Sequence, residues 1–204
     1  MNADAWIRRA AALVTTDAER LTRLDAAIGD GDHGLNLERG FSAAVAALPG
    51  DVPPGKVLLA AGRAIVSKTG GASGPLYGTA LRRAGKSLGD APEIGAANLG
   101  AALRAALDGV RELGKAEEGD KTMVDALAPA VAAYERTLEG GGDLASCARA
   151  AAEAAAQGAD ATVPLTARKG RASYLGERSA GHMDPGAAST ALIVRALSDV
   201  ASGE

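Results

Sequence analysis

The stretch Ile28-Gly29-Asp30-Gly31-Asp32-His33-Gly34 interrupts a helical pattern near the start of the chain, and Asp25 lies just upstream of it. Three carboxylates therefore fall within eight residues, separated by glycines. Two carboxylates in contact repel each other by roughly 3–4 kcal/mol at an effective dielectric constant of about 20, so a fold that gathers them needs a cation. The glycines let the backbone adopt positive φ and approach a ligand closely. The stretch favours a loop that binds a hard metal ion and an anion; the alternative is a solvated turn that caps the next helix.

Apolar residues recur at helical spacing on both sides of this loop. Upstream, Trp6, Ile7, Val14 and Leu21 fall on one face of a helix. The same pattern, bounded by Gly- and Pro-rich breaks, predicts eight helices. We expect them over residues 2–24, 34–48, 56–68, 76–88, 93–113, 121–138, 143–157 and 187–201. Asp120 is expected to cap the sixth of them.

The composition agrees with an all-α fold. Of the 204 residues, 47% are hydrophobic but only 2% are aromatic, so the core must consist mainly of Ala, Leu and Val. Small side chains let helices approach closely, and Ala is the best helix former. The length suits one domain, or at most two small ones. No repeat or linker divides the chain, so we expect a single domain over residues 1–204.

Charge and cysteine content exclude several classes of protein. The net charge is −3, so there is no basic field of the kind that binds nucleic acid. Cys147 is the only cysteine, which rules out an intrachain disulfide and favours a reducing compartment. We find neither a signal peptide nor an apolar run long enough to span a membrane. The expected location is the cytoplasm, with no membrane partner.

The order of the helices predicts where the loops lie. Successive helices in an up-and-down array run antiparallel, so the loops after odd-numbered helices share one end. Those loops are the polar, glycine-rich ones, around residues 25–34, 69–75, 114–120 and 158–186. The loops expected at the other end are Pro- and Gly-rich stops with little chemistry, around residues 49–55, 89–92 and 140–142. All the chemically promising loops should therefore meet at one end.

The acidic loop has the chemistry of a site for a hard divalent cation. Carboxylates without thiolates suit Mg²⁺, Mn²⁺ or Ca²⁺. An EF-hand counted from Asp30 is excluded, because Leu35 and Phe41 stand where Gly and Glu are required. Zinc is disfavoured by the shortage of histidines. Mg²⁺ takes a few carboxylates plus substrate phosphates, which fits the three aspartates, although Asp25 alone could equally be a surface residue at a helix C-terminus.

Other segments suggest that the anion is a phosphate. Residues 29–34 match G-x-G-x-x-G, but a dinucleotide fold requires a preceding strand, and a helix is expected here. Residues 70–74 precede a helix N-terminus, which favours phosphate, although a flexible turn is the alternative. Arg168, Lys169 and Arg171 add positive charge. Together these features indicate phosphoryl transfer.

Individual assignments within that reaction stay open at this stage. Arg171 would stabilise charge on the transferred phosphoryl group, or would be a solvated loop residue. His182 is explained equally well by a hydrogen bond that stabilises the loop. Tyr77, Met123 and Leu35 could line an adenine pocket or belong to the core.

Four motifs carry a resemblance to a known family. They are GDGDHG at residues 29–34 followed by Asn36, GGASGPLYG at 70–78, GDKTM at 119–123 and HMDPG at 182–186. In this order, over nearly the whole chain, the sequence resembles the DAK2-domain family, the nucleotide-binding L subunits (DhaL) of dihydroxyacetone kinases. The resemblance implies an eight-helix antiparallel barrel with the nucleotide at one end, in agreement with the loop order.

The resemblance also implies site residues. Asp25, Asp30 and Asp32 match the ligands of two Mg²⁺ ions that bridge the phosphates of ADP or ATP. Arg171 matches a catalytic position that also contacts the nucleotide. The other implied nucleotide contacts are His33, Gly34, Leu35, Asn36, Ala72, Ser73, Gly114, Met123, Asp184, Pro185 and Gly186.

The implied activity is that of a kinase subunit. A chain without a second domain resembles the free subunit, which passes the γ-phosphoryl of bound Mg-ATP to dihydroxyacetone on a separate K subunit. A phosphotransferase-system subunit would then rephosphorylate the bound ADP. The alternatives are a kinase subunit that uses free ATP for another small ketose, a nucleotide-sensing module that binds a regulator, and a purely structural protein. A second copy of the chain, in a homodimer, is a further candidate partner.

Overall fold

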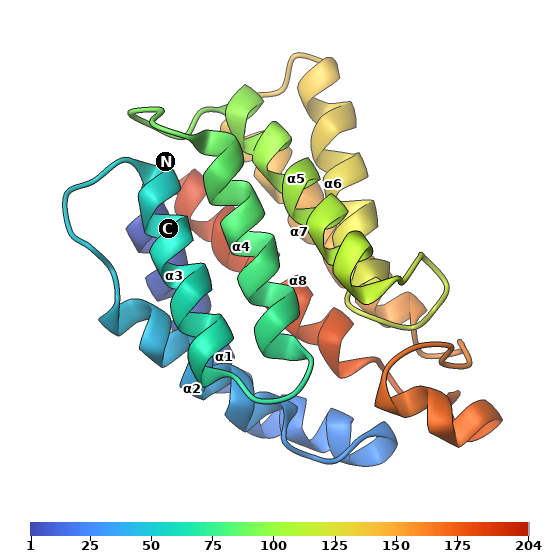
Figure 1. Ribbon diagram of the computed structural model, residues 1–204. Helices are drawn as coiled ribbons and strands as arrows, with labels where there is room; N and C mark the ends of the chain where they lie inside the picture. The colour runs from blue at the N-terminus through green and yellow to red at the C-terminus, as the bar shows by residue number, and fades with distance from the viewer. Residues whose placement is uncertain (204) are drawn as a thin grey trace.

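The computed structural model describes residues 1–203, and this part of the chain is helical without strands (Figure 1). The all-α prediction is confirmed. The helices are α1 (Ala3–Ile28), α2 (His33–Ala46), α3 (Pro54–Lys68), α4 (Ser73–Leu88), α5 (Ala96–Gly114), α6 (Val124–Glu139), α7 (Leu144–Ala161), the 3₁₀ helix η1 (Arg171–Ser179) and α8 (Pro185–Ser202). Within residues 1–203, no helix combines the length and apolar character needed to cross a membrane.

The eight α-helices form a closed ring. Each packs against its neighbour in sequence, and α8 packs back against α1, which closes the array into a barrel. In Figure 1 the α3–α4 and α5–α6 loops and the connector between α7 and α8 lie at one end, whereas both termini lie toward the other. The predicted antiparallel barrel is therefore confirmed.

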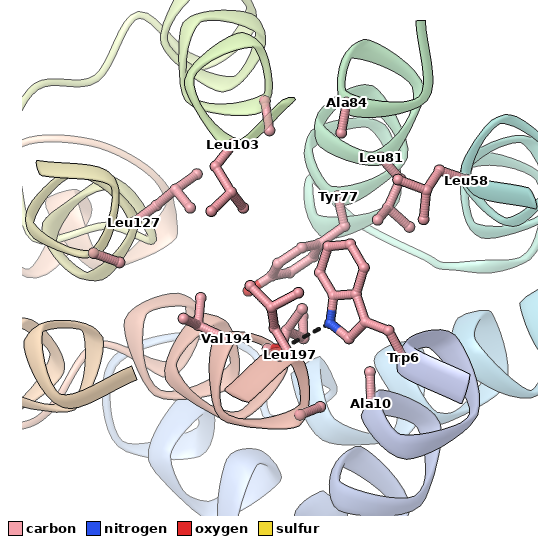
Figure 2. Close-up of a cluster of buried hydrophobic side chains, with 14 of the residues drawn as sticks. Trp6, Ala10, Leu58, Tyr77, Leu81, Ala84, Leu103, Leu127, Val194 and Leu197 are labelled. Carbon is pink, nitrogen blue, oxygen red and sulfur yellow. Dashed lines mark hydrogen bonds between the residues drawn. The ribbon is translucent and has the colours of Figure 1, made fainter. Parts of the chain in front are cut away.

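Small residues let the helices approach closely enough for this ring. A Cβ added to Gly85 of α4 would lie 2.6 Å from the carbonyl oxygen of Gly55 in α3, so these two helices meet backbone to backbone. Four of the five aromatic residues, Trp6, Phe41, Tyr77 and Tyr134, are buried in the interior. Figure 2 shows Trp6 of α1 pointing into the core, where its indole N–H donates to the carbonyl of Ile193 in α8 (3.1 Å).

Two predicted helix boundaries were wrong in ways that affect the acidic loop and the GDKTM segment. Helix α1 ends at Ile28 instead of residue 24, because Ile28 is buried, and Asp25 therefore lies in the last helical turn. Helix α6 begins at Val124 instead of residue 121. Asp120 does not cap it, because the carboxylate of Asp125 accepts the preceding backbone N–H groups instead.

The remaining boundaries differ by a few residues. Helix α4 begins at Ser73 and α8 at Pro185, so both start closer to the glycine-rich motifs than expected. Helix α5 begins later, at Ala96, and α7 continues to Ala161. The connector after α7 contains a 3₁₀ helix that the apolar pattern did not predict, because only Ala172 and Ser179 in it are buried.

Candidate functional site

A cavity of about 290 Å³ opens at the end of the barrel where the polar loops were expected. Its walls come from the acidic loop after α1, the loop before α4, the segment between α5 and α6, and the connector before α8. The prediction that these four loops meet is therefore confirmed.

Three carboxylates gather at this cavity. Asp25, Asp30 and Asp32 each offer an oxygen that lies within 4.8 Å of the other two. Asp25 is buried and accepts the backbone N–H groups of Asp32 (2.9 Å) and His33 (3.1 Å), so the loop folds back over the helix end. Gly31 makes this turn with φ of 74°. An all-carboxylate donor set of this kind fits Mg²⁺.

A cation of the protein already faces this acidic group. Arg171, at the start of η1, places its Nη2 2.9 Å from a carboxylate oxygen of Asp30. The Arg171 side chain is 68% exposed, so the ion pair contributes little stability. Its importance is positional, because it keeps the guanidinium at the cavity mouth.

Three helices begin at the cavity and point their N-termini into it. Helix α2 starts at His33, α4 at Ser73 and α8 at Pro185, and all three residues line the cavity. The free N–H groups and the positive end of the dipole at each N-terminus favour an anion. The cavity therefore combines a carboxylate cluster for a cation with three anion-binding helix ends.

A hydrogen-bond chain links these helix starts. Ser73 Oγ lies 3.1 Å from Nδ1 of His33, and Nε2 of His33 lies 2.9 Å from Ser189 Oγ. The hydroxyl of Tyr77 contacts Ser189 Oγ (2.7 Å) and donates to the carbonyl of Gly186 (3.0 Å). Burial lowers the pKa of His33, which favours the neutral imidazole between the two serines.

The N-terminus of α8 carries a carboxylate with unusual titration. Asp184 accepts the N–H of Ala187 (2.7 Å) and so caps the helix. Burial raises the pKa of Asp184 to about 7, against the opposing effect of the N–H from Ala187 and the charge of Lys121. Because this pKa lies near 7, a large fraction of the Asp184 carboxyl groups is protonated at neutral pH, which limits the negative charge on this side of the cavity.

The cavity also has an apolar wall. Leu76, Val110, Ala116 and Met123 line it beside the polar groups. Such a wall can accept a flat, poorly hydrated group next to a charged one. The site thus has separate places for a cation, an anion and an apolar ring.

Comparison with known proteins places this arrangement in a family. The DAK2 domain matches residues 27–199 of the chain. The chain belongs to the DAK2 domain family. The "PEP-dependent dihydroxyacetone kinase, ADP-binding subunit DhaL" of Escherichia coli is 43% identical over 194 residues, covering 94% of this chain and 92% of that protein. The D-erythrulose kinase of Mycolicibacterium smegmatis is 43% identical over 185 residues, covering 89% of this chain but 32% of that protein.

A solved structure supports the same fold. The dihydroxyacetone kinase from C. freundii, in complex with AMP-PNP and Mg²⁺, superposes with a TM-score of 0.73 and 28% identity. The match covers 97% of this chain and 33% of that one. This DAK2 domain thus spans about a third of that kinase, whereas it spans nearly all of the E. coli subunit.

Most of the predicted site residues line the cavity of this DAK2 domain. They are Asp25, Asp30, Asp32, His33, Ala72, Ser73, Gly114, Met123, Arg171, Asp184, Pro185 and Gly186. The structure thus brings together residues from the four regions of the chain that form the cavity walls. Their contacts with a metal or nucleotide stay predictions.

Three predicted contacts do not line the cavity. Gly34 packs against α1, where an added Cβ would lie 1.9 Å from the carbonyl oxygen of Ala18. Leu35 is 54% exposed, and Asn36 is buried against Gly70. A nucleotide contact at these positions stays a prediction; the structure shows close helix packing at Gly34 and burial at Asn36.

Several cavity residues were not predicted individually. Lys121 and Thr122 belong to the GDKTM motif, and Lys169 belongs to the basic cluster, so all three had a sequence signal. Ile28 and Val110 had none, because an apolar residue on a helix looks the same whether it lines a core or a cavity.

Proposed function

We propose that this DAK2 domain is the ADP/ATP-binding subunit of a dihydroxyacetone kinase. It passes the γ-phosphoryl of Mg-ATP to dihydroxyacetone held on a separate K subunit. The observation that carries this proposal is the carboxylate cluster facing three helix N-termini in one cavity. The E. coli relative, named as an ADP-binding subunit, supports it by matching over 92% of its own length.

The cavity residues take separate roles in this proposal. Asp25, Asp30 and Asp32 would hold two Mg²⁺ ions, whose charge offsets that of the nucleotide phosphates. The N–H groups that begin α2, α4 and α8 bind phosphate oxygens, while the apolar wall that includes Met123 takes the adenine. Arg171 stabilises the charge on the phosphoryl group during transfer, because its guanidinium already lies beside the acidic loop.

Surface chemistry supports a protein partner at the same end. Within residues 1–203, the large hydrophobic side chains that are exposed are Leu35, Val66, Leu113 and Tyr174. Each belongs to a helix start, a helix end or the connector at the cavity end. A K subunit docked there would cover these side chains and bring its ketose to the cavity mouth.

A second candidate function differs from the first in its phosphoryl donor and in the ketose that it phosphorylates. A phosphotransferase-system subunit that rephosphorylates ADP fits the E. coli relative, whose name is PEP-dependent. The 43% identity to a D-erythrulose kinase supports a kinase subunit for another small ketose. In this second candidate the phosphoryl donor would be free ATP. The cytoplasmic location expected from the sequence also stays a prediction.

Native mass spectrometry of the purified chain tests the ligand first, and we expect co-purified ADP. Mixing the chain with the K-type subunit encoded in the same genome, Mg-ATP and either ketose tests the reaction. Formation of dihydroxyacetone phosphate supports the leading proposal, and preferential phosphorylation of erythrulose supports the second. Bound nucleotide without transfer to any ketose would instead indicate a nucleotide-sensing module.

A further inference from the structure

Lys121 is buried in an unusual way. The residue is 1% exposed, and its backbone φ is 62°, a conformation that residues other than glycine rarely adopt. Nζ donates to backbone carbonyl oxygens of Thr162 (2.8 Å), Leu165 (3.0 Å) and His182 (2.5 Å), with Val163 farther away at 3.4 Å. Burial of an ammonium costs desolvation free energy unless it is hydrogen-bonded. These four carbonyl oxygens therefore stabilise Lys121 in its buried position.

These carbonyls belong to both ends of the connector that forms one part of the cavity wall. Thr162 and Leu165 lie where the chain leaves α7, and His182 lies where it returns to α8. Thr162 also accepts the N–H of Asp184 through its hydroxyl (2.9 Å). Lys121 therefore holds the two ends of this connector together by hydrogen bonds, and α8 begins only three residues after His182.

A second link fixes the same loop to the same segment. The N–H of Arg168 donates to the carbonyl of Asp120, next to Lys121 (3.0 Å). Between these attachments lie Lys169, Gly170 and Arg171, all of which line the cavity. The placement of the connector thus depends on residues 120–121, which are about forty to sixty positions away in sequence from their partners.

We propose that Lys121 is a positioning residue of the nucleotide site, which ties the two ends of the 162–184 connector together and so sets the N-terminus of α8 and Arg171 against the bound phosphates. This inference rests on the proposed function. The hydrogen bonds of Lys121 act on the backbone of the connector, because all four of their acceptors are carbonyl oxygens of that segment.

The test uses Lys121→Met, which keeps the length of the side chain and removes its donors. ADP affinity with Mg²⁺ is measured by calorimetry on the full chain, at a temperature where circular dichroism shows the variant folded. We expect a loss on the order of tenfold to a hundredfold, because small misplacements of a binding group have effects of that size. Lys86→Met, an exposed lysine of α4, is the matched control and should bind ADP like the parent.

A second variant separates positioning from bulk stability. Lys121→Ala removes three carbons and the ammonium nitrogen, which are the heavy atoms of propylammonium. Added propylammonium should therefore restore part of the ADP affinity. Tetramethylammonium carries the same charge but has no N–H donor, and it should not restore it. Restored affinity supports the proposal. A raised melting temperature with unchanged ADP affinity would show that the lysine serves stability alone, and would overturn it.

Hydrogen exchange distinguishes this proposal from the proposed function itself. Without nucleotide, amides of residues 163–184 should exchange faster in Lys121→Met than in the parent, whether or not the chain binds ADP. If the parent does not bind ADP, the proposed function fails, while faster exchange still supports the tether. Unchanged exchange in the connector overturns the inference about Lys121.

Discussion

The two ends of the barrel solve different problems. At the end away from the cavity, the turns at Gly50, Gly89 and Gly141 place glycine where φ is positive, and an added Cβ there would touch nothing within 4 Å. At the cavity end, positive φ occurs at glycines such as Gly31 and Gly170 and also at Lys115 and Lys121, the only residues other than glycine that adopt it within 1–203. The far end thus uses positive φ only at glycine, whereas the cavity end also places two lysines in a backbone conformation that residues other than glycine rarely adopt.

Most buried charged groups follow the same division. Five of the six buried charged or histidine residues lie at the cavity end, namely Asp25, His33, Lys121, Asp125 and Asp184, and the sixth, Asp199 of α8, lies toward the far end and pairs with Arg9. The ion pair of Lys56 at the far end is exposed. Strained and buried polar groups persist where the surrounding structure over-determines them, and they cluster at functional sites. This difference between the two ends therefore favours the cavity end as the functional end of the barrel.

Replacing Asp30 with Ala should have the largest effect. The variant removes one of three clustered carboxylates. Loss of a group that only orients a metal ligand lowers metal affinity or activity by up to about a hundredfold. Because Asp30 is a proposed ligand itself, we expect Mg²⁺-dependent ADP affinity to fall by at least about that factor. Helical content should stay intact, because Asp30 is exposed. The control is Asp51→Ala, an exposed aspartate at the far end. Normal ADP affinity in Asp30→Ala would show that the metal assignment is wrong.

Adding one methyl group at each end should give unequal losses of stability. In Gly34→Ala the new Cβ would meet the carbonyl oxygen of Ala18 at 1.9 Å, so α2 must move away from α1. Overpacking of this kind lowers the free energy of unfolding by about 1–3 kcal/mol. Gly140→Ala should be nearly neutral, because its Cβ would make contacts no closer than 3.5 Å. Urea unfolding of both variants measures the difference, and equal midpoints would contradict the helix contact.

The fold and most of the site could be predicted because they follow from order and spacing. Helix number sets which loops share an end, and the short spacing of Asp25, Asp30 and Asp32 makes their clustering almost local. The position of Asp25 inside α1 was missed, because it depends on burial of Ile28 against Ala172 of the distant connector.

Lys121 shows the limit of prediction more sharply. Its motif was visible, but its burial depends on carbonyl groups of residues 162, 165 and 182. A sequence gives no direct sign of which backbone oxygens will face a given ammonium, because every residue has one. Long-range packing alone decides this contact.

Asp184 gives the smallest and most specific prediction. Its pKa of about 7 in the folded chain lies above the unfolded value of about 3.9, so the folded state binds more protons between these values. This contribution to stability is therefore complete below about pH 4 and is lost as the pH rises toward 7. Asp184→Asn keeps an oxygen that can accept the N–H of Ala187, and it removes the titration. Relative to this variant, the parent should lose about 2–2.5 kcal/mol of unfolding free energy between about pH 4.5 and 6.5. Urea unfolding across this range measures the loss, and because His33 titrates in both proteins, their difference isolates Asp184. If the unfolding free energies of the parent and of Asp184→Asn change in parallel with pH, the pKa of Asp184 is not raised by burial. The carboxyl would then contact water, and this electrostatic difference between the two ends of the barrel would be absent.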